Sequence, residues 1–63
     1  MDFHIILTIT NKLLYFSEIG EKYTVSIEEC AEIAKKLNNT KTDRKFKVSY
    51  APNDEYAVIW RSK

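Results

Sequence analysis

The sequence predicts an α+β fold in which one helix packs on an antiparallel sheet, in the order β-β-β-α-β-β, within one small domain of residues 1–63. Three observations support this prediction. The first part of the chain alternates apolar and polar residues, a central segment has a helical period, and the end of the chain alternates again. Turn-forming residues separate these segments, so their boundaries are predicted as well.

The N-terminal part is expected to form three antiparallel strands. Residues 3–10 alternate with a period of two, and the N-K pair at 11–12 suits a tight hairpin because Asn tolerates a left-handed backbone. Residues 13–19 form the second expected strand, which ends at Gly20, a favourable first position for a type II′ turn. The third strand then continues through Val25.

A capped helix is predicted over residues 26–39. Ser26 precedes Glu29 by three residues, the spacing of a capping box, and acids in the first turn with lysines in the last turn match the helix dipole. The apolar positions at helical spacing are Ile27, Cys30, Ala31, Ala34 and Leu37. The acids Glu28, Glu29 and Glu32 form a negative ridge, which is interpreted either as a solvated face or as a partner-binding surface.

The end of the chain is expected to form a second hairpin around the turn A-P-N-D. Its register has two solutions. A three-residue loop pairs Phe46 with Trp60, whereas a two- or four-residue loop places Val48 opposite Ile59. The first solution is preferred here, because aromatic cross-strand pairs add stability.

The sheet face away from the predicted helix is expected to be an interface. The expected register places four apolar side chains there, which is more than a solvated face needs. A chain of this size also buries little apolar surface alone and buries more when two copies associate. A homodimer is therefore predicted. Its interface residues are Ile6, Leu13, Tyr15 and Ile19. The alternative is that loops or the C-terminal hairpin cover this face as a second layer.

A second candidate surface is basic. Lysines and arginines near the C-terminal hairpin are able to contact phosphates, and the aromatic residues beside them are able to stack on bases. The basic residues are Arg44, Lys45, Lys47 and Arg61, and the aromatic residues are Tyr50, Tyr56 and Trp60. The alternatives are a solubilising edge for the lysines and a core position for the aromatic residues. Because the net charge is only +1, nucleic-acid binding is the second prediction and not the first.

No catalytic, cofactor or metal site is predicted. His4 has no Ser, Cys or Asp at a spacing that indicates a catalytic triad, and Cys30 lies on the apolar face of the predicted helix. One cysteine and one histidine make neither a zinc quartet nor an intramolecular disulfide. The start M-D-F-H lacks the basic region of a signal peptide, and no run approaches the roughly 18 apolar residues of a membrane span. A soluble, cytoplasmic, non-enzymatic protein without cofactors is expected.

The segment L-Y-F-S-E-I-G-E-K-Y-T-V-S-I-E-E-C, residues 14–30, resembles segments of small uncharacterised proteins encoded by phages of low-GC bacteria. In these proteins a hairpin leads into a capped helix. The resemblance implies a short non-enzymatic protein that binds and blocks a host protein, often a component of antiviral defence and often as a dimer. The predicted function is therefore a phage-type inhibitor in a bacterial host cell, and the alternative is a small nucleic-acid-binding protein.

Overall fold

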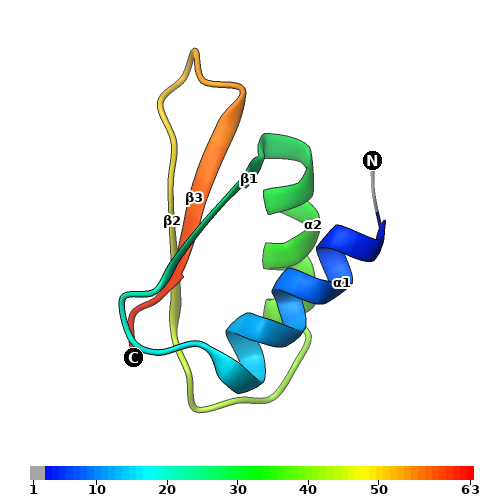
Figure 1. Ribbon diagram of the computed structural model, residues 1–63, viewed down its shortest axis with the longest axis vertical. Helices are drawn as coiled ribbons and strands as arrows, with labels where there is room; N and C mark the ends of the chain where they lie inside the picture. The colour runs from blue at the N-terminus through cyan, green and yellow to red at the C-terminus, as the bar shows by residue number, and fades with distance from the viewer. Residues whose placement is uncertain (1–2) are drawn as a thin grey trace.

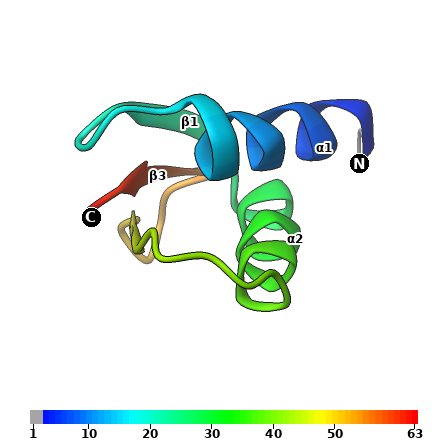
Figure 2. The ribbon, with the colours of Figure 1, turned by 90° about the horizontal axis from the view of Figure 1, so that it is seen from below.

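The computed structural model describes residues 3–63. The elements in chain order are α1 (Phe3–Asn11), the π-helical turn η1 (Lys12–Phe16), β1 (Lys22–Ser26), α2 (Ile27–Asn38), β2 (Phe46–Ser49) and β3 (Tyr56–Arg61). The three strands form an antiparallel sheet in the order β1-β3-β2. Both helices lie on the same side of this sheet (Figures 1 and 2). The class is thus mixed α+β, as predicted.

The prediction of strands in the first 19 residues is wrong, and the order β-β-β-α-β-β is replaced by α-β-α-β-β. A short, strongly apolar run does not distinguish a strand from a buried helix by periodicity. In the helix, Ile6, Thr10 and Leu13 recur at helical spacing and are buried. The Thr10 hydroxyl donates a hydrogen bond to the carbonyl of Ile6 at 2.6 Å. The buried hydroxyl of this residue, which favours strands, therefore has a hydrogen-bond partner inside the helix.

The π-helical turn η1 widens the end of the N-terminal helix. The backbone N–H of Ser17 donates to the carbonyl of Lys12 at 2.6 Å, five residues earlier. In this wider turn both Leu13 and Leu14 are buried, although they are consecutive in the sequence. The Ser17 hydroxyl donates to the carbonyl of Leu13 at 2.9 Å, which satisfies a buried polar group at the point where the turn ends.

The prediction of a capped central helix is confirmed. The Ser26 hydroxyl accepts a hydrogen bond from the Glu29 backbone N–H at 3.1 Å, and the Glu29 carboxylate accepts one from the Ser26 N–H at 3.3 Å. The helix α2 begins at Ile27 directly after this capping box. It buries Cys30, Ile33 and Leu37, so its apolar face covers the sheet as expected.

The second predicted hairpin is also present, but its preferred register is wrong. Val48 lies opposite Ile59, and Lys47 lies opposite Trp60, which is the alternative register. This register places Ile59 and Ala57 on the inner face of the sheet, where they are buried. Burial of these two side chains in the core outweighs the aromatic cross-strand pairs that the other register offers.

One hydrophobic core lies between the helices and the inner face of the sheet. Its buried members are Ile6, Leu13, Leu14, Val25, Cys30, Ile33, Leu37, Ala57 and Ile59. The helix α1 packs across α2, and α2 packs on β1 and β3 (Figure 2). The strand β2 lies at the edge of the sheet, beyond the part that α2 covers.

Two arginines, one in the linker after α2 and one at the end of β3, bind the end of the N-terminal helix. The Arg44 guanidinium donates from Nη1 to the carbonyls of Leu13 at 3.0 Å and Ser17 at 3.1 Å. Arg61 donates from Nη1 to the Ser17 carbonyl at 3.0 Å. The last carbonyls of a helix have no partner within it and carry the negative end of its dipole, so both cations are stabilising here.

Replacement of Arg44 by methionine removes these hydrogen bonds while it keeps much of the side chain's length. We expect Arg44→Met to lower the free energy of unfolding by about 2 kcal/mol, as for other hydrogen bonds from charged groups. Urea unfolding followed by circular dichroism measures the change. Lys41→Met, at an exposed position of the same linker, is the control and should have little effect. Equal losses in the two variants would contradict the proposed role of Arg44.

Candidate functional site

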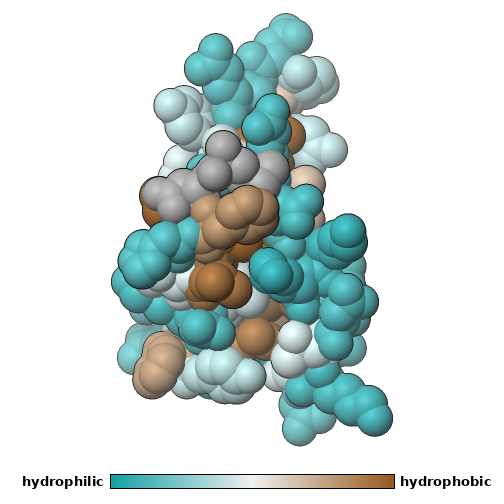
Figure 3. Space-filling view, turned by 90° about the vertical axis from the view of Figure 1, so that its right-hand side faces the viewer, coloured by the Kyte–Doolittle hydropathy of each residue, from teal (hydrophilic) through white to brown (hydrophobic). Residues whose placement is uncertain are grey.

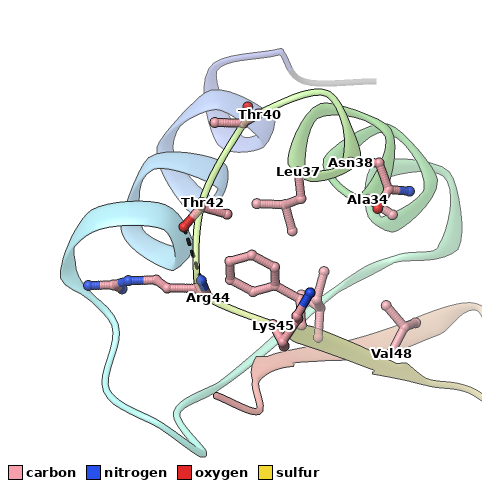
Figure 4. Close-up of a pocket in the computed structure, with 10 residues that line it drawn as sticks. Ala34, Leu37, Asn38, Thr40, Thr42, Arg44, Lys45 and Val48 are labelled. Carbon is pink, nitrogen blue, oxygen red and sulfur yellow. Dashed lines mark hydrogen bonds between the residues drawn. The ribbon is translucent and has the colours of Figure 1, made fainter.

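A groove lies between α2 and β2, where the helix layer ends before the edge of the sheet. It has two adjoining parts, of about 420 Å³ and about 270 Å³. Ala34 of α2 and Val48 of β2 line both parts, so the groove follows the helix along the strand. Figure 4 shows the larger part, with Leu37 pointing toward the strands from α2.

The larger part of the groove has an apolar floor and a polar end. The floor is formed by Ala34, Leu37, Phe46, Val48 and Ile59, and the polar lining residues are Asn38, Thr40, Thr42, Arg44 and Lys45. Thr40, Thr42 and Arg44 lie at one end, whereas Asn38 lies beside Ala34 on the other side (Figure 4). Thr42 is oriented by its hydroxyl, which accepts a hydrogen bond from the Arg44 backbone N–H at 3.2 Å (Figure 4). The Arg44 guanidinium is directed to η1, so Lys45 is the cation that remains at this end. Among residues 3–63, no carboxylate lines this part.

The smaller part of the groove is lined by apolar and aromatic side chains. Its residues are Ile27, Cys30, Ala31, Ala34, Val48, Tyr50 and Ala57. Two of the α2 residues on this wall are alanines, whose small side chains leave the space open. The sequence predicted Ala31 and Ala34 on the apolar face, but it carried no signal that β2 would stop short of covering them.

The outer edge of β2 lies beside this groove. Because the sheet order is β1-β3-β2, the strand pairs on one side only. An edge strand presents a row of backbone N–H and C=O groups to any extended chain that approaches it. An apolar groove and an accessible strand edge therefore meet along residues 46–49.

The outer face of the sheet is uncovered by any helix (Figure 2). Trp60 lies at its centre, between Lys22 of β1 and Lys47 of β2 in the cross-strand register. The Lys22 Nζ is 5.7 Å from the centroid of the Trp60 ring, a cation–π distance. The sequence predicted Lys47 and Trp60 as candidates but not Lys22, because the expected register turned Trp60 inward.

The four residues of the predicted dimer interface do not form one surface. Ile6 and Leu13 are fully buried in the core of the chain, whereas Tyr15 and Ile19 are exposed. The cause is the helical fold of this segment, which replaces the expected two-faced sheet. The alternative that a second layer covers the expected face is not realised either, because the segment itself belongs to the helix layer.

The predicted acidic ridge is only partly available to a partner. Glu28 is exposed, but Glu29 and Glu32 are half-buried, and Glu29 is engaged in the capping box. The basic residues are likewise divided. Lys45 and Lys47 are exposed, whereas Arg44 and Arg61 are half-buried and bind carbonyls at the end of the N-terminal helix.

Nothing in the described part of the chain assembles a metal site. Among residues 3–63, no three His, Cys, Asp or Glu side chains are close enough together to hold an ion. No helix in these residues has the length and apolar character needed to cross a membrane. Burial raises the pKa of the Cys30 thiol, so the thiolate is disfavoured in the folded protein.

Comparison of the chain with known protein families, with curated proteins and with solved structures found no match. The resemblance of residues 14–30 to phage-encoded proteins remains a prediction.

The position of Cys30 predicts an unreactive thiol. Because the pKa is raised, we expect reaction with a disulfide reagent at pH 8 to be at least about tenfold slower in the native protein than in urea. The same shift predicts that the free energy of unfolding falls as the pH rises above the ordinary thiol pKa, since only the unfolded chain then ionises. Equal rates in the folded and unfolded protein would show that the thiol is accessible. Cys30→Ser is the control for the pH dependence.

Proposed function

We propose that this protein is a small, non-enzymatic protein-binding module that takes an extended segment of a partner into the groove between α2 and β2. The observation that carries this proposal is the coincidence of two features along the same four residues, Phe46–Ser49. These are an accessible strand edge and a groove with an apolar floor that follows the neighbouring helix. Strand addition beside a helix is an established mode of peptide recognition.

In this mode the partner's backbone pairs with the edge of β2, and its alternate side chains enter the groove. A strand rises about 3.3 Å per residue and alternates its side chains, so four paired residues direct two side chains inward. The two parts of the groove provide a place for each of them. Main-chain pairing supplies affinity, and the fit of these two side chains supplies specificity.

The lining of the groove indicates the chemistry of the partner. Aliphatic side chains suit the floor, and an acidic side chain or a terminal carboxylate suits the end that carries Thr40, Thr42 and Lys45. In the described part of the chain no carboxylate lines either part of the groove, which also favours an acidic group on the partner. The favoured segment is therefore extended and apolar, with an acid at the end that lies near Lys45.

The resemblance of residues 14–30 to phage-encoded proteins gives the proposal a finer form. In this form the partner is a host protein in the bacterial cytoplasm, and the small protein acts as its inhibitor by occupying a segment that the host protein needs. Because the segment is held by main-chain pairing, inhibition requires no catalytic group.

A second copy of the chain is a second candidate partner, supported by a different surface. Most of the large apolar side chains that are exposed in the described residues belong to the N-terminal segment 3–19. They are Phe3, Ile5, Leu7, Tyr15, Phe16 and Ile19. Figure 3 shows hydrophobic surface in the middle of the side that carries α1 and α2. Phe3 and Leu7 are four residues apart and lie on one side of α1. Tyr15, in the π-helical turn, adds to the exposed apolar surface of the same segment, which suits symmetric pairing.

The groove proposal predicts which peptides the protein selects. From a library of random peptides we expect extended sequences with apolar residues at alternate positions and an acidic residue at one end. Val48→Glu places a charge on the wall that both parts of the groove share. It should lower the affinity for the selected peptides at least about tenfold. Val58→Glu is the matched control, since Val58 lies on the same sheet but on its outer face. Titration by calorimetry measures both affinities.

Amide chemical shifts locate the peptide directly. The largest changes should fall on residues 46–50 and on the α2 wall of the groove. Changes centred on α1, or equal losses in the two valine variants, would exclude the groove as the binding site.

The self-association proposal makes a separate prediction. We expect the wild-type protein to be a dimer by sedimentation equilibrium and Tyr15→Glu to be a monomer, because a charge on the helix side opposes apolar pairing. Tyr50→Glu is the matched control, since Tyr50 is 62% exposed against 61% for Tyr15. A monomeric wild-type protein, or a dimer that persists in Tyr15→Glu, would contradict self-association through this side.

A further inference from the structure

The open outer face of the sheet carries a row of lysine, tryptophan and lysine across its three strands. Lys22 of β1 and Lys47 of β2 both pair with Trp60 of the central strand β3. Side chains that are directly opposite in adjacent strands lie on the same face, so the two ammonium groups flank the indole. The Lys22 Nζ already lies 5.7 Å from the ring centroid.

The charge on this face has one sign. None of the residues in the three strands is acidic, although the chain as a whole has nine acids and a net charge of only +1. The backbone N–H of Ser62 donates to the carbonyl of Lys45 at 2.7 Å, which extends the pairing of β2 and β3 beyond the assigned strands. Two lysines, Lys22 and Lys47, thus flank Trp60.

A second aromatic residue lies along the same strand. Tyr56 is four residues before Trp60, so it shares the outer face at a distance of about 13 Å along the strand. Its side chain is exposed, whereas the Trp60 ring is half-buried and therefore held in place. Between them, Val58 is flanked across the strands by the small polar residues Thr24 and Ser49. The central strand thus carries two aromatic side chains on this face, and the flanking strands carry small polar side chains between them.

We infer that this face binds single-stranded nucleic acid. Proteins that bind single strands combine aromatic side chains, on which bases stack, with lysines or arginines that follow the phosphates. A base stacks on the Trp60 indole, and the Lys22 ammonium moves from the ring to the phosphate of the same nucleotide. Lys47 contacts a phosphate on the other side of the indole, and Tyr56 offers a second stacking position.

The combination of groups favours this ligand over an acidic protein. An acidic peptide would be attracted by the lysines but would gain nothing from the exposed face of an indole, whereas every base has a face that stacks on it. A duplex buries its base faces within its own stack, so it offers only phosphates to this surface. The inferred site also differs from the basic hairpin predicted from the sequence, because Arg44 and Arg61 are bound to carbonyls on the inner side.

Trp60 provides the assay, because it is the only tryptophan in the chain. We expect an oligothymidylate of about ten nucleotides to quench the Trp60 fluorescence to saturation at low salt. With two phosphate contacts on a single strand, the logarithm of the binding constant should fall with the logarithm of salt concentration with a slope of about −1.4. A duplex of the same length should bind weakly and leave the emission nearly unchanged.

Substitution of single lysines tests the placement of the site. Lys22→Gln and Lys47→Gln should each weaken binding and reduce the magnitude of the salt slope by about 0.7. Lys35→Gln is the matched control, since Lys35 is exposed on α2 and away from the sheet face. Trp60→Phe, checked for folding by circular dichroism and assayed with a labelled oligonucleotide, should bind more weakly than the wild-type protein.

Three results would overturn the inference. The first is an unchanged Trp60 emission at low salt, and the second is equal salt slopes in Lys47→Gln and Lys35→Gln. The third is binding of polyglutamate as tightly as oligothymidylate, which would identify a general surface for acidic chains. None of these results bears on the groove between α2 and β2, so the protein-binding proposal is judged separately.

Discussion

The inward orientation of Ala57 and Ile59 is the constraint on which the rest of the surface depends. Both side chains are buried against α2, and Ile59 lies opposite Tyr23 on one neighbouring strand and Val48 on the other. Since side chains alternate along a strand, this choice directs Val58 and Trp60 outward. A slip of one residue would exchange the two faces of β3, and the aromatic surface would become core. The position of every outward residue of the sheet therefore follows from the burial of two aliphatic side chains.

The elements that the sequence predicted well are those whose signals are local. The capping box of Ser26 and Glu29 and the helical period after it depend only on nearby residues, and the structure confirms both. The N-terminal segment carries no comparable signal. Its alternation suits a strand, and its apolar residues also suit a helix buried on one side. Partners that are distant in the sequence decide between the two, because Arg44 and Arg61 bind the carbonyls at the helix end.

The candidate surfaces were predictable to different degrees for the same reason. Lys45 and Lys47 were identified as exposed basic residues, because charged residues on an edge strand are seldom buried. The partnership of Trp60 with Lys22 depends on the order β1-β3-β2, which pairs strands that are distant in the sequence. The groove depends on how far α2 extends over that sheet. The apolar period of a single segment predicts neither the order of the strands in the sheet nor how far a helix extends over that sheet.

The strand β2 connects the two proposed binding surfaces. Its alternation directs Val48 toward the groove and Lys47 toward the open face, so neighbouring residues of one strand belong to the two different surfaces. An extended partner that pairs with β2 adds a fourth strand to the sheet, and this strand borders the open face beside Lys47. The outward side chains of the partner then become part of that face. Acidic residues at those positions would oppose a nucleic-acid phosphate there, whereas basic residues would extend the lysine row, so occupation of the groove sets the charge that a single strand meets.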